Sequence, residues 1–543
     1  MQKEDLEAGE DQPKKQGKWM LLIVMSLVGF VMFLDTTMMN VAITDIVNDL
    51  DTSISTVQGA ISLYALVMAA FMVTGGKIGE MYGLKKVFII AMIMYAIGTT
   101  MAAIAPTIGF LILGWSVIEG LGVAMLLPIT TIMITIYYKG LDRAKALSVF
   151  AAVASVAGAL GPIYGGAMTS FFSWRWAFAS ELIVVAVIFL MLKYVHAPEP
   201  SRTEGQKLDI KGTVLMASSL TIILLAVMGI ATYGFWTPKE AFALFGREIT
   251  PFGISIIPFA FALGFGLFAW FMKWETKLMK ASKEPLLDIT VFKNRKFKAS
   301  VVVGGILAFI ITGTFFVIPV FLQTAFGFSA IETGVALLPM TLSLMVFALI
   351  FAPLGSRFSP RTISQLGLAI IAIGAIVLNR SLSMELVTRD LVPGLLIFGA
   401  GVGIITSQIT NLAMSSVKKE HTTEASGINN TLRQFGTALG TAILGTVLVA
   451  GFFIVMEAGV NESTALSEEQ KSATITAVHQ STQNAEGQVH VQAELNEAET
   501  TEITKIIDDS ILGSMTITLY TIIFFVILSL ILSRKLPKEK FPK

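Results

Sequence analysis

The chain of 543 residues lacks cysteine altogether, which excludes disulfide bonds, thiolate metal sites and cysteine catalysis. It is also short of charge, because Asp, Glu, Lys and Arg make up 14% of the residues against about 25% in a typical soluble domain. The formal net charge of +1 gives no sign of nucleic-acid binding, so we expect no nucleic-acid partner. Together with a mean hydropathy of +0.74, the shortage of charge excludes a water-soluble enzyme.

Apolar residues are abundant instead: 54% of the chain is hydrophobic, and the mean hydropathy is +0.74. They gather in about fourteen continuous runs of roughly 20 residues, the length that crosses a bilayer as a helix. A β-barrel would instead show shorter segments that alternate between apolar and polar residues. Residues 1–18 are polar, and no cleavage pattern follows them, so the first apolar run is predicted to be a span. The fold class is therefore an all-α polytopic membrane protein with 14 spans.

Basic residues predict the orientation. With the N-terminus placed in the cytoplasm, 31 of the 39 Lys and Arg residues fall in cytoplasmic tails and loops, seven fall in the opposite loops or at their edges, and Arg433 lies inside a span. This bias is typical of positive-inside insertion. We expect the protein to lie in the plasma membrane, with both termini in the cytoplasm.

A weak internal repeat predicts two halves. The sequence GGKIGEMYGLKKV follows the second span and APLGSRFSPRTI follows the tenth, and the two are at matching places once spans 7 and 8 are set aside. Duplicated six-helix halves are typical of secondary transporters. The expected division is a tail at 1–18, an N-terminal half at 19–195, two extra spans with cytoplasmic linkers at 196–298, a C-terminal half at 299–533 that includes an external loop at 457–509, and a tail at 534–543.

Five further stretches carry a family resemblance: LDTTMMNVA at 34–42, GALGPIYGG at 158–166, SWRWAF at 173–178, FLQTAFGFSAIETGVALLP at 321–339 and ASGINNTLRQFGTALG at 425–440. On these motifs the chain resembles the fourteen-span drug:proton antiporters of the major facilitator superfamily, the group of EmrB-type and quaternary-ammonium exporters. The resemblance implies the major facilitator fold of two six-helix halves plus two additional transmembrane helices. It also implies multidrug efflux by alternating access, powered by the proton gradient without a cofactor. Protons, membrane lipids and small amphipathic or lipophilic cations are the implied partners of a bacterial, monomeric protein.

The span 5 motif is rich in small residues. It contains Gly158, Gly161, Pro162, Gly165 and Gly166. Glycines let two helix backbones approach closely, and the proline permits a bend. Ordinary helix packing explains such residues as well, whereas the resemblance implies that this antiporter motif seals the cavity between the halves during exchange.

The loop after the second span predicts a gate at the cytoplasmic face. Its residues are Gly76, Glu80, Gly83, Lys85 and Lys86. Glycine suits a tight turn between helices, and the nearby charges can latch one conformation and release it in the other. Ordinary positive-inside anchoring is the alternative. Glu80 stands where the family usually has Asp and Leu84 where a basic residue is usual, so the latch is expected to be weaker.

Four ionisable residues lie within apolar spans: Asp35, Glu119, Glu181 and Arg433. Each costs roughly 2.5–3.5 kcal/mol on insertion scales, and such residues usually line a pathway. A buried carboxyl group can hold a proton and release it when an organic cation arrives. We therefore expect proton-coupling or substrate-binding roles.

Each of these assignments has a structural alternative. Glu119 could serve only in a structural pairing, and Glu181 could be solvated or paired with Arg175. Arg433 could simply neutralise a carboxylate or bond to a carbonyl group.

The chain departs from the family pattern in these spans. Ser116 stands where the family has the span 4 arginine implicated in proton transfer, and Glu119 stands where it has a glutamine. Glu181 replaces a usual asparagine. Either the proton route has been rebuilt around Glu119 or the coupling differs, and the added negative charge favours cationic substrates.

Methionine and phenylalanine are abundant, at 26 and 37 residues. Methionine re-packs around ligands of varied shape, as a promiscuous binding surface requires. The expected cavity wall consists of Met38, Met39, Met125, Phe321 and Gln323. The polar loop 457–509 is either a small helical lid over the cavity mouth or a linker.

Two other functions remain open. A lipid or fatty-acid exporter of the same fold would also suit an apolar cavity and a long external lid. An integral-membrane enzyme is disfavoured, because the four histidines form no HExxH motif and no GxSxG motif occurs in a suitable context. We expect neither enzymatic activity nor a resident metal.

Overall fold

The computed structural model describes residues 15–536 and 538, except for 139, 195–207, 239–241, 245–246, 282–284, 288, 352–353, 355–356, 418–421 and 484–496. Most of both predicted tails and part of the linker between the sixth and seventh expected spans therefore lie outside the described residues.

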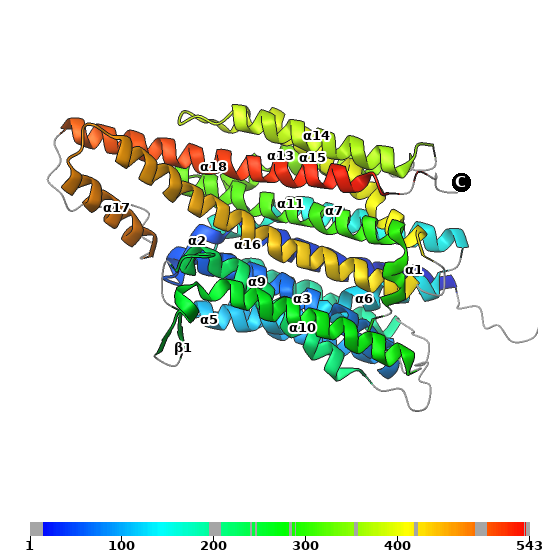
Figure 1. Ribbon diagram of the computed structural model, residues 1–543. Coiled ribbons are helices and arrows are strands. Elements are labelled where there is room, and N and C mark those ends of the chain that lie inside the picture. Colours follow the sequence, from blue (N-terminus) through cyan, green and yellow to red (C-terminus); the bar gives the residue numbers. More distant parts are fainter. Residues whose placement is uncertain are drawn as a thin grey trace, which may run out of the picture.

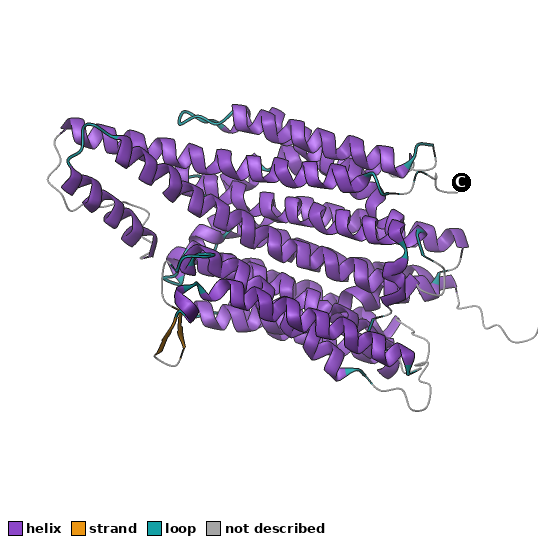
Figure 2. Ribbon diagram, viewed as in Figure 1, coloured by secondary structure: helices purple, strands orange, loops and turns teal. Residues whose placement is uncertain are grey.

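Helices account for nearly all of the described chain (Figure 2). The N-terminal half contains α1 (Lys15–Met38), η1 (Met39–Val41), α2 (Ile43–Asp49), α3 (Ile54–Tyr82), α4 (Leu84–Ala103), α5 (Ile108–Leu111), η2 (Ile112–Glu119), α6 (Gly120–Tyr137), α7 (Gly140–Phe171), α8 (Trp174–Met191) and η3 (Leu192–Tyr194). The central part contains α9 (Ile210–Tyr233), β1 (Phe242–Leu244), β2 (Arg247–Ile249), η4 (Pro251–Gly253), α10 (Ile256–Lys280) and η5 (Ile289–Lys293). The C-terminal half contains α11 (Arg295–Phe326), α12 (Ala330–Ala336), α13 (Leu338–Phe351), α14 (Pro360–Arg380), α15 (Thr388–Ser415), α16 (Thr422–Glu462), α17 (Glu468–Gln483) and α18 (Glu497–Ser533).

The predicted spans are present. Among the described residues, 13 segments are long and apolar enough to cross a membrane, and α7 occupies the place of the remaining expected span, the fifth. The strands β1 and β2 form an antiparallel hairpin outside the spans, with Phe242 opposite Ile249. The all-helical polytopic fold class is thus confirmed.

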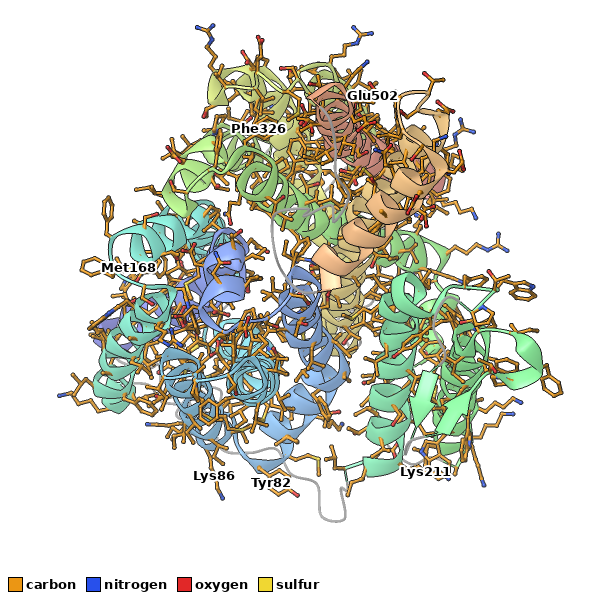
Figure 3. All side chains as sticks on the ribbon, turned by 90° about the vertical axis from the view of Figure 1, so that its left-hand side faces the viewer. Tyr82, Lys86, Met168, Lys211, Phe326 and Glu502 are labelled. Atoms are coloured by element: carbon orange, nitrogen blue, oxygen red, sulfur yellow. The ribbon has the colours of Figure 1, made fainter. Side chains whose placement is uncertain are left out.

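The two ends of the bundle differ. In Figure 1 the start of α1 and the C-terminal end lie at one end, which we call the terminal end, and α17 and β1 lie at the other, which we call the loop end. Figure 3 looks onto the loop end and shows three groups of helices side by side: the N-terminal half, the C-terminal half and the α9–α10 pair. Helix α10 packs on α9, and α9 packs on α3 and α16, so the additional pair joins both halves from one side.

The gate motif after the second expected span is more helical than predicted. Helix α3 continues to Tyr82, and only Gly83, at φ 100°, separates it from α4. That positive φ is accessible to glycine at little cost, so one residue suffices for the turn. Gly76 lies within α3, where a Cβ would be 3.4 Å from Cβ of Pro128 on α6. Gly83 thus forms the predicted turn, and Gly76 allows the close approach of α3 to α6.

The halves meet at the loop end. The Gln323 Nε2 atom on α11 donates to the carbonyl of Val41 on η1 at 2.8 Å, and the hydroxyl of Thr44 on α2 donates to Gln323 Oε1 at 2.7 Å. Further along the bundle, the buried amide of Gln58 on α3 donates to the carbonyl oxygens of Thr441 and Ala442 on α16. Side-chain amides thus connect the two halves.

The loop 457–509 forms helical structure where it is described. Helices α16 and α18 continue into it, and α17 lies beside α16 (Figure 1). These parts pack together through a small apolar cluster that is separate from the main core. Its buried members are Met456, Val460, Leu466, Ile503 and Ile506. The linker alternative therefore does not describe residues 457–483 and 497–509, and residues 484–496 lie outside the described part.

Candidate functional site

Three predicted carboxylates converge inside the N-terminal half. Asp35 lies on α1, Glu119 ends η2 and Glu181 lies on α8, so they come from three different spans. One oxygen from each lies within 4.8 Å of the others. The exposed fractions of the three residues are 0%, 0% and 2%. We call Asp35, Glu119 and Glu181 the carboxylate triad.

Neutral groups donate hydrogen bonds to Asp35 and Glu119. The indole Nε1 of Trp115 donates to both oxygens of Asp35, at 3.1 and 3.2 Å. The Thr99 hydroxyl donates to Glu119 Oε2 at 2.7 Å, and the Tyr64 hydroxyl donates to Glu119 Oε1 at 3.5 Å.

Glu181 is only half satisfied. The Tyr95 hydroxyl donates to its Oε2 at 2.7 Å, whereas its Oε1 is buried without a hydrogen-bond partner. Within the described residues no Lys, Arg or His contributes a hydrogen bond or ion pair to the triad. The site is therefore rich in negative charge and has no fixed counter-charge.

Aromatic rings enclose the triad. Trp115 stacks on Tyr64 with ring centroids 4.9 Å apart, and the ring of Phe178 meets Trp115 edge-on at 6.0 Å. All three rings are at most 2% exposed. Charges in such an apolar, water-excluding setting interact strongly, so the occupancy of the site by a cation has a large energetic effect.

Glu119 sits at the end of a π-helical segment, η2. Such segments are rare and are frequent at functional sites. Two glycines bring η2 against α4: a Cβ on Gly98 would lie 2.5 Å from Cβ of Glu119, and a Cβ on Gly114 would lie 2.4 Å from Cβ of Met101. This close packing fixes the backbone of Glu119 beside Thr99, the α4 residue that bonds to it.

Ser116, which stands where the resemblance implies an arginine, joins two helices. Its hydroxyl donates to the carbonyl oxygen of Ala60 on α3 at 2.8 Å. The serine is fully buried, and among the described residues no basic side chain bonds to it.

Arg433 does not join the triad. It lies half-buried on α16 in the C-terminal half. Among the described residues, no hydrogen bond or ion pair joins Arg433 to the triad.

The two structural alternatives for Glu181 are wrong. Glu181 is not solvated, and Arg175 instead pairs with Asp49, donates to the Ala105 carbonyl at 2.6 Å and stacks over Trp174.

The span 5 motif lies between two neighbouring helices. A Cβ on Gly165 would lie 2.4 Å from the carbonyl oxygen of Met38 on α1. A Cβ on Gly166 would lie 2.5 Å from the carbonyl oxygen of Ala330 on α12, in the other half. Gly161 packs against Thr37 of α1, whereas a Cβ on Gly158 would have no atom within 4 Å.

The neighbouring turn of α7 makes a second contact with the other half. A Cβ on Gly334 of α12 would lie 2.5 Å from the carbonyl oxygen of Pro162. The motif therefore presses α7 against both α1 and α12 at the loop end.

The five predicted wall residues have different surroundings. Gln323 lies between the halves, and Met38 and Met39 are 1% and 2% exposed at the contact of α1 and η1 with α7. Met125 packs its backbone against Gly75 of α3. Phe321 lines a small apolar pocket of the C-terminal half together with Leu378 and Leu395.

Several site residues escaped the sequence analysis. These are Tyr64, Tyr95, Thr99 and Trp115, the donors to the triad. Their spacing carried a signal: Tyr95 and Thr99 are four residues apart on α4, and Trp115 and Glu119 are four apart on span 4, so each pair shares a helix face.

Comparisons with known proteins agree with this architecture. The sequence profile described as Major Facilitator Superfamily matches residues 25–281 and 250–441. The chain is 26% identical over 442 residues to "Multidrug resistance protein Stp" of Mycobacterium tuberculosis, covering 80% of this chain and 77% of that protein. It is 28% identical over 447 residues to "Multidrug resistance protein 3" of Bacillus subtilis, covering 80% of each. "Quinolone resistance protein NorB" of Staphylococcus aureus is 27% identical, covering 79% of this chain and 88% of that protein.

Solved structures share the fold. A bacterial homologue of the human lysosomal transporter Spinster, in an inward-facing and unoccupied conformation, superposes with a TM-score of 0.61 at 14% identity, covering 98% of this chain and 100% of that one. The human organic anion transporter MFSD10 gives a TM-score of 0.56 at 12% identity, covering 96% and 100%.

Proposed function

Since the chain belongs to the Major Facilitator Superfamily, we propose that it is a transporter. We propose further that it exports small amphipathic cations from the cell in exchange for protons. The chain is a multi-pass membrane protein of a transporter family rather than an enzyme. The observation that carries the proposal is the buried carboxylate triad of Asp35, Glu119 and Glu181.

The relatives support the substrate class. Two are named as multidrug resistance proteins and one as a quinolone resistance protein, and each matches about 80% of this chain. Export of drugs is therefore the activity we assign to this chain.

The triad supports the coupling ion. Three carboxylates within 4.8 Å cannot all stay charged in an apolar interior unless cations compensate them. The donors around them are neutral, so protons are the simplest compensation. Binding of a cationic substrate makes the loss of those protons favourable. This competition links export of the substrate to import of protons.

The contacts between the halves support alternating access. In this conformation η1 and α2 contact α11, and α7 contacts α12, all at the loop end. With the terminal end placed in the cytoplasm, as the Lys and Arg distribution predicts, these contacts close the external side. Export requires them to separate, and the span 5 motif would seal them again.

Dye transport into inverted membrane vesicles tests the proposal. Ethidium uptake energised by a proton gradient should collapse on addition of a protonophore and should fall at least tenfold in Asp35→Asn and in Glu119→Gln. Both substitutions preserve side-chain size and remove the charge. Glu385→Gln is the control, because Glu385 is an exposed carboxylate outside the triad. Gradient-dependent uptake that persists in both triad variants would overturn the assigned roles.

A further inference from the structure

We infer that the carboxylate triad also binds a hard metal cation of calcium-like size, taken up in place of protons. Asp35, Glu119 and Glu181 would supply the ligand oxygens. The inference rests on the proposed function in one respect, namely that the triad is a site of cation exchange.

The first argument is charge. The triad carries up to three negative charges, and no basic side chain of the described residues is bonded to it. Its surroundings are apolar rings that exclude water. A divalent cation offsets two of the three charges at one point, which neutral donors do not achieve.

The second argument is the unpartnered oxygen. Glu181 is 2% exposed, and its Oε1 has no hydrogen-bond partner although its Oε2 accepts from Tyr95. A buried carboxylate oxygen without a partner is costly, and a bound cation would satisfy it. The Tyr95 hydroxyl and the Trp115 indole then resemble the outer-shell donors that orient metal-binding carboxylates.

The third argument combines the spacing of the oxygens with the dryness of the site. Two oxygens on opposite sides of a metal are separated by twice the metal–oxygen distance, which is about 4.2 Å for Mg²⁺ and roughly 4.6–5.2 Å for Ca²⁺. The three triad oxygens all lie within 4.8 Å of one another, so a single Ca²⁺ can contact all three. The buried, apolar enclosure also favours Ca²⁺, because Mg²⁺ demands near-ideal octahedral geometry and gives up its waters reluctantly. The donor set is also of the right chemistry, because both ions prefer oxygen ligands.

Additional oxygens are available nearby. The hydroxyls of Tyr64 and Thr99 already contact Glu119, and each can turn a lone pair toward a cation. Bidentate binding by the carboxylates, together with these hydroxyls, would bring the ligand count into the range of six to eight that is usual for Ca²⁺.

Calorimetric titration of the purified full-length protein tests the inference. The detergent-solubilised chain is stripped with a chelator and titrated with CaCl₂ and, separately, with MgCl₂ at one fixed pH. We expect saturable binding of one Ca²⁺ per chain and at least tenfold weaker binding of Mg²⁺. Asp35→Asn and Glu181→Gln should each weaken Ca²⁺ binding at least tenfold, while Glu385→Gln should leave it unchanged.

The controls separate folding from binding. Size-exclusion profiles and helical circular dichroism identify any variant that fails to fold, and two independent triad variants make it possible to judge the site even if one is lost. Absence of saturable Ca²⁺ binding by the wild-type chain would overturn the inference. So would Ca²⁺ binding that survives in both folded triad variants, or Mg²⁺ binding as tight as that of Ca²⁺.

A second readout separates this inference from the proposed function. Ethidium transport is measured in inverted vesicles with a chelator present. Protonophore-sensitive transport in a protein that binds no Ca²⁺ would overturn the metal site and leave drug:proton exchange intact. Triad-dependent Ca²⁺ binding by a protein that moves no drug would support the metal site and overturn the proposed function.

Discussion

The indole of Trp115 donates from Nε1 to both carboxylate oxygens of Asp35, at 3.1 and 3.2 Å. This contact joins span 4 to span 1 beside Glu119 and Glu181. The same ring stacks on Tyr64, which also reaches Glu119. Trp115 therefore links the aromatic enclosure to the carboxylate that the sequence places in span 1.

Replacing Trp115 by phenylalanine should weaken transport although an aromatic ring remains at this position. Trp115→Phe retains an aromatic side chain next to Tyr64 but removes the indole N–H that donates to both oxygens of Asp35. A buried acceptor without a partner costs about 1–3 kcal/mol, so we expect roughly tenfold slower ethidium transport and a lower melting temperature. Trp176→Phe is the control, because Trp176 is 59% exposed on α8. Equal transport by the two variants would contradict the assigned role of the indole.

Adding one methyl group at Gly166 should hold the loop end open. A Cβ there would lie 2.5 Å from the carbonyl oxygen of Ala330, so α7 and α12 must separate in Gly166→Ala. Gly158→Ala is the matched control, because no atom lies within 4 Å of a Cβ at that position.

The absence of cysteine makes this separation measurable. Spin labels attached to cysteines introduced at Phe172 and Val335, which are 67% and 46% exposed, report the distance between α7 and α12. Gly166→Ala should lengthen that distance, and Gly158→Ala should leave it unchanged. An unchanged distance in Gly166→Ala would show that the close approach does not hold the halves together.

Removing the amide of Gln323 should loosen the contact between η1 and α11. Gln323→Leu loses the bonds to the Val41 carbonyl and the Thr44 hydroxyl while filling a similar volume. We expect faster hydrogen exchange in residues 39–49, because these bonds tie that segment to the other half. Gln365→Leu is the control, since Gln365 bonds to Ser533 within the C-terminal half. Identical exchange in both variants would refute the bridging role.

The helical segment of the loop 457–509 should behave as a separable unit. Leu466 is 6% exposed in the small cluster that contains Met456 and Ile506. Truncating a buried leucine to alanine typically costs about 2–5 kcal/mol, so Leu466→Ala should raise hydrogen exchange in α17 and spare the bundle. Leu263→Ala, at a 56% exposed position on α10, should change neither. A global fall in the melting temperature of Leu466→Ala would contradict local unfolding.

The fold was predictable from the sequence to a large extent. Continuous apolar runs predict spans because a bilayer requires helices of that length, and the predicted all-helical, fourteen-span architecture agrees with the structure. The helix end at Tyr82 was not predictable in the same way. A polar run containing Lys77 and Glu80 resembles a loop, yet one glycine at positive φ suffices for the turn.

The candidate site was predictable in part. Asp35, Glu119 and Glu181 were identified because charge within an apolar span is costly, which one sequence alone reveals. Their convergence depends on how α1, η2 and α8 rotate and pack, which periodicity does not determine. Arg433, chosen by the same criterion, lies on α16 in the C-terminal half that the sequence predicts, and no hydrogen bond or ion pair found among the described residues joins it to the triad.

Proton release on drug binding tests the central claim most directly. Purified protein in weakly buffered solution is mixed with ethidium, and a pH indicator records the protons released. If the triad of Asp35, Glu119 and Glu181 holds the exchanged protons, the wild-type chain and Glu385→Gln should release protons in proportion to bound drug. A variant combining Asp35→Asn, Glu119→Gln and Glu181→Gln should release none while remaining folded. Undiminished release from that variant would contradict the account.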